Sequence, residues 1–374
     1  MRVVLYLNYL NHHQVAVADA FYDLLSDDFT CICTQKPSSY ELKGGEDYST
    51  KIYCINATTS TEHYKQALIY ARTADVCLFG ADSLEYAIER AKYNQCGLSF
   101  EIGERWLKKG IINILSPRLI KNLWFYHTLF RHRKFYKLCA SGYAAKDQNK
   151  LLSYRNKCYK WGYFPKPIEC SSKDSISNPI SVMWCSRFLR WKHPEMPIKA
   201  ASILKQKGYD FVLDMYGEGE ELECCKDLSK EQNIQERVNF YGNVPNYKIK
   251  DAMKEHDVFL FTSDRNEGWG VVLNEAMASS CAVVCSDLIG SVPYLICDGE
   301  NGLIFKSGDI NSLVEKMEYL FVNQCKIIEL GSKARQAIIG LWSPQVAVHN
   351  FMKLVIELTL GQDSSIIEGP CSKA

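Results

Sequence analysis

Two glutamates, Glu267 and Glu275, stand eight positions apart in the segment with the clearest potential for chemistry. The apolar run 257–263 before them is a predicted buried strand, and 271–279 is rich in residues that form helices. The turn between them, 264–270, contains two glycines. A strand, a glycine turn and a helix start favour an anion, because free backbone N–H groups and the helix dipole both attract negative charge. We therefore expect a phosphate group at this turn.

The spacing of the two carboxylates suggests what lies on each side of that phosphate. Glu267 precedes the predicted helix, and Glu275 lies about five residues inside it, roughly 7 Å further along at 1.5 Å rise per residue. Two acceptor-only side chains can bind hydroxyl groups on either side of a phosphate. A nucleotide sugar has this order of sugar hydroxyls, diphosphate and ribose hydroxyls. The alternative is an ordinary strand–helix unit that carries surface glutamates.

The segment Glu-Gly-Trp-Gly-Val-Val-Leu-Asn-Glu resembles the Glu-x7-Glu signature of family 4 (group 1) glycosyltransferases. These are retaining enzymes with the α/β GT-B fold, in which two Rossmann-like domains face each other across a cleft. The resemblance implies that Glu267 contacts the transferred sugar and Glu275 the ribose of the donor. It implies that the diphosphate is held near Gly270, Val271 and Val272. The other donor-binding positions in this loop are Gly268 and Trp269, and the loop could select among hexoses.

Two cations, Arg187 and Lys192, lie five positions apart after the first predicted strand of the second domain. Ligands bind at such loops in open α/β sheets, and an arginine fork with a lysine point charge can neutralise a diphosphate. The stretch resembles the family's Gly-Arg…Lys-Gly loop, with Ser186 where glycine is usual. The resemblance implies a catalytic role for Arg187 and Lys192 on the leaving diphosphate. Arg190 is an alternative cation, and a loop of solvated charges is an alternative interpretation.

Two further glycines, Gly217 and Gly219, follow the second predicted strand of that domain. They form two thirds of a dinucleotide fingerprint, which is weak evidence alone. They match the family's Gly-x-Gly turn near the nucleotide, and we interpret them as turn residues first and donor-binding residues second. The chain has no Asp-x-Asp metal motif. Because cations and a helix start already oppose the phosphate charge, we expect metal-independent transfer and no cofactor beyond a UDP- or GDP-linked sugar.

Acceptor-side candidates lie in the first predicted strand–helix turn, where Asn11, His12 and His13 resemble bacterial capsule and exopolysaccharide members of the family. Adjacent histidines could bind an acceptor sugar, and either could assist proton transfer near neutral pH. The alternative is a capped turn with one buried histidine.

Two carboxylates complete the acceptor-side candidates. Relatives commonly carry a histidine after the fourth strand, whereas this chain has Asp82 there. Glu104 belongs to a stretch that resembles the Ser-Glu-Arg segment of the same subgroup, and it could face the acceptor or only pair with Arg105. In the resembled family the leaving diphosphate helps to deprotonate the acceptor, so no enzymic nucleophile is required.

The domain organisation follows from repeated strand–helix alternation along 374 residues, a length that suits two domains. We expect an acceptor domain at 1–168 and a nucleotide-sugar domain at 180–342, joined by a proline-bounded linker at 169–179. The resemblance implies that a helix at about 343–360 packs back on the first domain. Residues 362–374 are predicted to be a frayed tail.

Charge is unevenly distributed, since the chain has a net charge of +1 but residues 105–168 carry 15 Lys and Arg against one acid, Asp147. Aromatic residues interleave with these cations, which is typical of a surface that binds anionic lipid. RNA would use similar groups, but no RNA-binding module is visible, so we expect no nucleic-acid partner. A solvated basic face is the alternative.

Sixteen cysteines are scattered without Cys-x-x-Cys or paired zinc spacing, which favours a reducing compartment. There is no signal-peptide pattern and no 18-residue apolar run. We predict a cytoplasmic protein, peripheral at the inner membrane face, that transfers a sugar to a glycan or lipid-diphosphate acceptor. The alternatives are a GT-B epimerase or phosphorylase, or an inactive nucleotide-sugar-binding partner of a membrane assembly.

Overall fold

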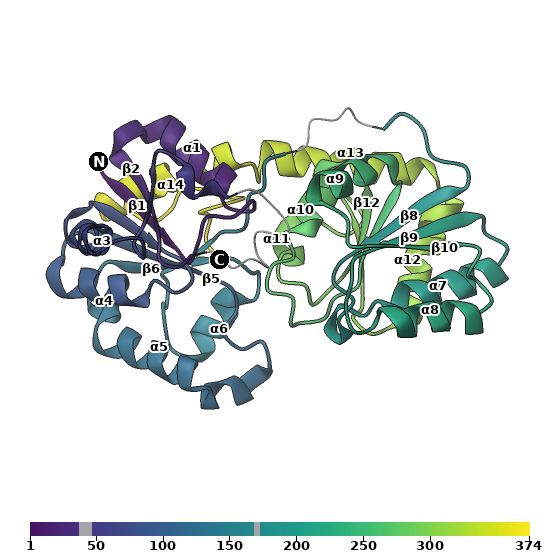
Figure 1. Ribbon diagram of the computed structural model, residues 1–374, viewed down its shortest axis with the longest axis horizontal. Coiled ribbons are helices and arrows are strands. Elements are labelled where there is room, and N and C mark those ends of the chain that lie inside the picture. Colours follow the sequence, from purple (N-terminus) through teal and green to yellow (C-terminus); the bar gives the residue numbers. More distant parts are fainter. Residues whose placement is uncertain (37–46, 168–172) are drawn as a thin grey trace. The chain divides into compact units, whose positions relative to one another are not determined.

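A computed structural model describes residues 1–36, 47–167 and 173–374 of the chain. Part of the predicted linker, residues 169–172, lies outside the described residues. The chain forms two compact units, one of Met1–Lys166 with Leu341–Ala374 and the other of Pro167–Gly340. Each unit is a parallel sheet with helices packed on it (Figure 1), so the predicted α/β class with two Rossmann-like domains is confirmed.

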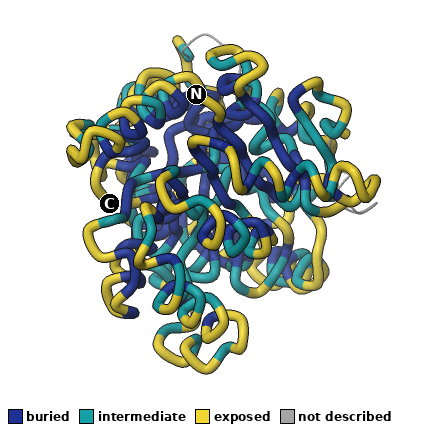
Figure 2. Tube along the Cα trace, turned by 90° about the vertical axis from the view of Figure 1, so that its left-hand side faces the viewer, coloured by how far each residue is buried: buried dark blue, intermediate teal, exposed yellow. Residues whose placement is uncertain are grey.

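The first unit contains a seven-stranded sheet whose neighbouring strands pair in parallel. From edge to edge the strands are β3 (Cys54–Asn56), β2 (Phe29–Cys33), β1 (Val3–Leu7), β4 (Val76–Phe79), β5 (Leu98–Gly103), β6 (Phe135–Cys139) and β7 (Cys158–Lys160). Its helices are α1 (Val15–Leu25), α3 (Thr61–Thr73), α4 (Leu84–Tyr93), α5 (Pro117–Thr128), α6 (Ala144–Lys150) and α14 (Pro344–Thr359). All five residues of β1 are buried, as expected for a central parallel strand covered on both faces. Buried residues gather along the strands, and exposed ones along loops and outer helix faces (Figure 2).

The second unit contains a six-stranded parallel sheet. Its strands are β10 (Val238–Gly242), β9 (Phe211–Tyr216), β8 (Ile180–Cys185), β11 (Val258–Phe261), β12 (Ala282–Ser286) and β13 (Leu303–Phe305). Its helices are α7 (Glu195–Gln206), α8 (Leu222–Glu231), α9 (Asn246–Glu255), α10 (Val272–Ala278), α11 (Val292–Leu295), α12 (Ile310–Val322) and α13 (Cys325–Gly340). The strand order reverses between β8 and β11, and the carboxyl ends of strands at such a reversal are where open α/β sheets bind ligands.

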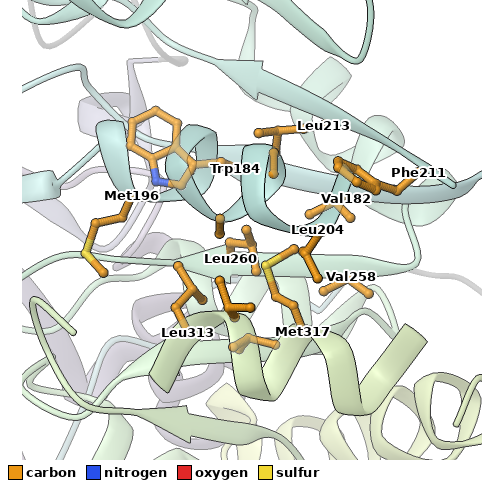
Figure 3. Packing of buried hydrophobic residues seen from close by; sticks show 14 of the residues in the cluster. Val182, Trp184, Met196, Leu204, Phe211, Leu213, Val258, Leu260, Leu313 and Met317 are labelled. Carbon is orange, nitrogen blue, oxygen red and sulfur yellow. The ribbon is translucent and has the colours of Figure 1, made fainter. Parts of the chain in front are cut away.

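Apolar side chains from both layers fill the core of the second unit (Figure 3). Trp184 and Leu260 come from neighbouring strands, while Leu313 and Met317 belong to α12 and Met196 to α7. Each of these side chains is at least 95% buried. This packing fixes the strand ends from which the loops of the candidate site emerge.

The C-terminal residues of the chain are ordered against the first unit, so the predicted frayed tail is wrong. Cys371 is buried and its N–H donates to the carbonyl of Lys160 at 2.7 Å, while Lys373 forms an antiparallel bridge with Tyr159. β7 is an edge strand with unpaired backbone groups, and the tail satisfies them. In α14, the ring of Phe351 packs on Phe21 and Phe100, with centroids 5.6 and 4.9 Å apart.

Within the described ranges, no helix has the length and hydropathy needed to cross a bilayer.

Gly217 is the glycine whose replacement the fold should tolerate least. Its φ is +127°, and a Cβ atom there would lie 1.9 Å from the carbonyl oxygen of Ser186. We expect Gly217→Ala to lower the free energy of unfolding by about 2–4 kcal/mol, because backbone must move in addition to the strain of a positive φ. Gly242→Ala is the matched control, since its φ is also positive (+68°) but its Cβ would meet open space.

The control should cost about 1 kcal/mol. Urea unfolding of both variants measures the difference. Equal losses for the two variants would show that the approach of Ser186 does not constrain this turn.

Candidate active site

The candidate site occupies the carboxyl ends of β8 and β11 in the second unit. Residues 186–192 follow β8, and residues 262–271 connect β11 to α10. α10 begins at Val272, so Glu275 lies in its first turn instead of the predicted position about five residues inside. α10 has seven residues, which is too short for a full macrodipole, so side-chain charges must supply most of the attraction for an anion.

A buried ion pair joins the two loops. The ammonium group of Lys192 contacts Oε2 of Glu267, and the two residues are each only 8% exposed. The Lys192 nitrogen also lies over the ring of Trp191, 4.2 Å from its centroid. Burial lowers the pKa of Lys192, and the charge of Glu267 opposes that shift. The structure thus brings together two residues that the sequence assigned separately to the sugar and to the diphosphate.

Hydrogen bonds from the strand ends hold the lysine loop in place. The hydroxyl of Thr262, just after β11, donates to the carbonyl of Lys192 at 2.7 Å, and the indole N–H of Trp184 on β8 donates to that hydroxyl at 2.9 Å. The N–H of Asp264 donates to the carbonyl of Trp191 at 3.0 Å. The position of Lys192 is therefore determined by groups in the core of the sheet.

Arg187, the other predicted cation, is exposed and forms no ion pair with any residue that the structure describes. Its charge acts on Lys192, so the two cations are close enough to repel. Their repulsion would be relieved by an anion bound between them. Arg190, the alternative cation, is also exposed.

Glu275 is the second buried carboxylate, 6% exposed. Lys250 on α9 is the nearest cation, 3.7 Å from its Oε1, yet that oxygen accepts no hydrogen bond in the described structure. Burial raises the pKa of Glu275, and the Lys250 charge opposes the shift. A buried carboxylate oxygen without a donor is costly, and a ligand hydroxyl could satisfy it.

Two serine hydroxyls near the same turn share this property. Ser263, two residues after β11, and Ser291, before α11, are buried without a hydrogen-bond partner among the described residues. The sequence did not single out Ser263, Ser291 or Lys250, because no spacing connects them to the Glu-x7-Glu segment. The orphaned polar atoms around this turn indicate that it is adapted to a polar ligand.

The glycines of the site allow backbone segments to approach closely. Gly270 has a φ of +86°, and a Cβ there would lie 2.4 Å from the ring of Phe261. A Cβ on Gly219 would lie 2.3 Å from the carbonyl oxygen of Phe188, so Gly217 and Gly219 both lie against the loop that carries Arg187. The turn that contains Gly217 and Gly219 and the loop that carries Arg187 are therefore neighbours in the structure.

The remaining loop residues contribute mainly through the backbone. The indole ring of Trp269 is buried and its N–H donates to Asn274 at 2.8 Å, so this ring packs in the interior of the unit. Gly268 is buried as well, and Val271 and Val272 are partly exposed at the start of α10.

In the first unit, Asn11 closes the turn between β1 and α1. Its side-chain oxygen accepts from the N–H of His13 at 2.9 Å, and its carbonyl accepts from Gln14 and Val15. The rings of His12 and His13 lie with centroids 3.7 Å apart, and both residues are partly exposed. The capped-turn alternative therefore describes Asn11, while both histidines retain some exposure.

Asp82 and Glu104 have different surroundings. Asp82 is exposed, with a φ of +55° just after β4. Glu104 pairs with Lys108 at 2.7 Å, whereas Arg105 pairs with Asp147 at 3.3 Å. The alternative in which Glu104 only pairs with Arg105 is wrong, because the buried carboxylate of Asp147 holds the guanidinium instead.

Comparison with known families and proteins bears on this geometry. A model of the family "Glycosyl transferases group 1" matches residues 171–338, which is most of the second unit. The amylovoran biosynthesis glycosyltransferase AmsK of Erwinia amylovora is 25% identical over 228 residues, which are 60% of this chain and 54% of that protein. A poly(ribitol-phosphate) alpha-N-acetylglucosaminyltransferase of Staphylococcus aureus (strain COL) is 26% identical over 45% of this chain and 34% of that protein. The chain thus spans about half or less of the length of these curated relatives.

Solved structures show the fold. A glycosyltransferase from Rickettsia africae ESF-5 has a TM-score of 0.71 and 15% identity, with 96% of this chain and 98% of that chain covered. HepE of Anabaena in complex with UDP has a TM-score of 0.70 and 15% identity, with 94% and 98% covered. These neighbours confirm the predicted GT-B type of fold.

The effect of the buried Glu275 carboxylate on stability can be measured without a ligand. We expect Glu275→Gln to raise the free energy of unfolding by about 1 kcal/mol at pH 8. The pKa of Glu275 is raised in the folded protein, so the charged form opposes folding. That penalty is absent below the pKa of the unfolded chain, grows as the pH rises through the folded-state pKa, and is constant above it.

Urea unfolding at pH 8 and near pH 4 measures this pH dependence, with Glu231→Gln at the exposed end of α8 as the control. The gain in the free energy of unfolding from Glu275→Gln should vanish near pH 4. A loss of stability at pH 8 would mean that Lys250 more than offsets the burial of the carboxylate.

Proposed function

We propose that this chain, whose residues 171–338 match the model of the family "Glycosyl transferases group 1", is a retaining glycosyltransferase similar to family 4. It moves a sugar from a UDP- or GDP-linked donor to a glycan or lipid-diphosphate acceptor in the synthesis of a surface polysaccharide. The curated relatives include a glycosyltransferase of amylovoran biosynthesis, which supports the polysaccharide context. HepE of Anabaena was solved with UDP, which supports a nucleotide donor.

The observation that carries this proposal is the buried pair of Lys192 and Glu267 beside the exposed Arg187. The two cations stand where the diphosphate of a donor would meet the ends of β8 and β11. Glu267 can accept hydrogen bonds from the sugar while it holds Lys192, and Glu275 can accept them from the ribose. Sugar, diphosphate and ribose would then each meet a group of matching chemistry.

The reaction requires the bond between the anomeric carbon and the diphosphate oxygen to break. Lys192 and Arg187 stabilise the negative charge that develops on the leaving diphosphate, which is the main electrostatic demand of the step. The acceptor hydroxyl forms the new bond on the same face of the sugar, and its proton passes to the leaving diphosphate. Two cations at the diphosphate and the absence of an Asp-x-Asp motif support transfer without a metal ion.

The two glutamates should separate chemistry from binding. We expect Glu267→Ala to lower kcat by about 10²–10³, a loss typical of removing one group that acts at the transition state, with little change in nucleotide affinity. Glu275→Ala should instead weaken donor affinity by about 10- to 100-fold, which is typical of a lost hydrogen bond to a charged group. Initial rates of nucleotide release and nucleotide titrations measure the two effects.

Two control variants distinguish a loss of catalysis from a loss of structure. Glu267→Gln keeps an acceptor for Lys192 and should still lose activity, while Glu231→Ala at an exposed site should be unchanged. Wild-type transfer by both the Glu267→Ala and Glu275→Ala variants would contradict the site. Nucleotide binding without turnover in the unmodified protein would favour the alternative of an inactive binding partner.

We also propose that the first unit contacts an anionic membrane surface through η3 (Gly110–Leu115) and α5. Five large apolar side chains are exposed there by 53–78%: Ile111, Ile112, Leu115, Ile120 and Trp124. Exposed cations on the same two elements or beside them are Lys109, Arg118 and Lys121, and none forms an ion pair with a described residue. An apolar patch bordered by free cations suits a lipid interface, and a lipid-linked acceptor would require one.

Part of the basic segment serves the interior instead. Lys137 is fully buried and pairs with Glu101 at 2.6 Å, and Arg105 pairs with Asp147. Lys137 and Arg105 are therefore not part of a solvated basic face. The membrane proposal rests on η3 and α5.

The proposed membrane contact is tested with liposomes. The triple variant Lys109→Gln, Arg118→Gln, Lys121→Gln should bind anionic liposomes at least tenfold more weakly at low salt, since each cation near such a surface contributes about 1 kcal/mol. Trp124→Ala should weaken binding further at high salt, where the apolar contribution remains. Co-sedimentation with liposomes measures both.

Lys65, Lys92 and Lys199 are exposed without ion pairs among the described residues, and their triple Gln variant is the control. Equal loss in the two triple variants would reduce the patch to a solvated face with only net-charge effects.

A further inference from the structure

Three cysteine thiols converge at one edge of the first unit. Cys31 and Cys33 lie on β2, two residues apart, and so share a face of the strand. The parallel register places Cys54 of β3 beside Cys31. All three sulfur atoms lie within 4.8 Å of one another, and those of Cys33 and Cys54 are 3.4 Å apart.

We propose that Cys31, Cys33 and Cys54 form a binding site for one thiophilic divalent metal ion of the zinc class. Two thiolate sulfurs on one tetrahedral zinc lie roughly 3.8 Å apart, as follows from Zn–S bonds of about 2.3 Å. One separation in the structure is 3.4 Å and none exceeds 4.8 Å, so ligation requires shifts of about 1 Å or less. At 3.4 Å the Cys33 and Cys54 sulfurs are free thiols, since a disulfide bond is about 2.0 Å long.

The convergence of three ligands distinguishes these residues from the other buried cysteines. Cys77 on β4 and Cys285 on β12 are fully buried and act as small hydrophobic residues. Among the described residues, this is the cluster in which three metal-ligating side chains meet. Sequence spacing did not predict it, because the ligands come from a Cys-x-Cys pair and from a neighbouring strand 21 residues later.

The site would fasten three pieces of the first unit together. β2 supplies two ligands and the edge strand β3 supplies the third. Directly after Cys33, the N–H of Thr34 donates to the carbonyl of Leu7 and that of Gln35 to the carbonyl of Asn8, both at 2.8 Å, which joins the end of β2 to the turn that carries Asn11, His12 and His13. A bound ion would therefore brace the turn that holds the acceptor-side candidates.

Metal binding to the three cysteines can be written with protons and charge in balance. Each thiol that is protonated in the free protein releases one proton to the buffer as it becomes a thiolate ligand. Three thiolates and one divalent ion leave a net charge of −1, and the fourth coordination position takes a water molecule. This site lies in a different unit from the proposed donor site and does not depend on the proposed function.

The test uses the full-length, reduced protein after metal removal, titrated with Zn²⁺ and with Co²⁺ as a spectroscopic probe. We expect one Zn²⁺ per chain by native mass spectrometry, with a Kd tighter than about 1 µM, and a sulfur-to-cobalt charge-transfer band with Co²⁺. Cys33→Ala should weaken binding at least tenfold and lower the intensity of the band. Cys77→Ala, a buried cysteine outside the cluster, should leave both unchanged.

Cys54→Ala, at a partly exposed position on the short edge strand, gives the same readout if Cys33→Ala fails to fold. Zinc uptake that survives both variants would place the metal elsewhere and overturn the proposal. The absence of a charge-transfer band would also overturn the proposal. The same holds if Cys33 and Cys54 form a disulfide and its reduction does not restore metal binding.

Discussion

The buried contact between Lys192 and Glu267 is the constraint on which the candidate site depends. Removing an ammonium and a carboxylate from water costs several kcal/mol for each ion, and their attraction offsets this only while they remain in contact. The loop after β8 and the turn after β11 must therefore stay together. Thr262 and Trp184 hold the lysine loop from the core side, so the position of the pair is a consequence of how the sheet of the second unit packs.

The same region concentrates polar groups that the protein alone leaves unsatisfied. Glu275 has an oxygen without a donor, Ser263 and Ser291 have hydroxyls without partners in the described structure, and Arg187 has no counter-ion there. Each of these features opposes folding, and they occur together around one turn. Such a concentration is expected where a site is shaped for a ligand at the expense of stability. A donor with sugar hydroxyls, two phosphates and a ribose carries groups that would satisfy all of them.

The sequence was a good guide to the regular strand–helix alternation and a poorer one elsewhere. Central strands such as β1 and β11 are continuous apolar runs, which the sequence pattern alone indicates, whereas Ser99 and Glu101 interrupt the apolar pattern of β5. α5 was missed since its cations and aromatic residues were interpreted as a lipid-binding composition, not as a helix. The sequence signal of α13 is weak as well. The helix contains Gly331, which allows close approach to Ser280 and weakens the helical signal.

The features of the candidate site likewise fall into those that the sequence shows and those that only the structure shows. The Glu-x7-Glu segment and the Arg187–Lys192 loop are local patterns, and the sequence shows them. The contact between Lys192 and Glu267 joins residues 75 positions apart, and that of Lys250 with Glu275 and the convergence of Cys54 on Cys33 likewise arise from packing. Pairings of this kind depend on strand order and register, which a single sequence does not specify.

The measurement that tests the central claim most directly is a donor screen with purified protein and no added divalent metal. A panel of UDP-, GDP- and other nucleotide sugars is offered with and without membrane extract as the source of acceptor, and released nucleotide is measured. Release from one donor, increased by the extract, is the predicted result. Silence across the panel, with thermal stabilisation by a nucleotide, would contradict transfer and leave a binding protein.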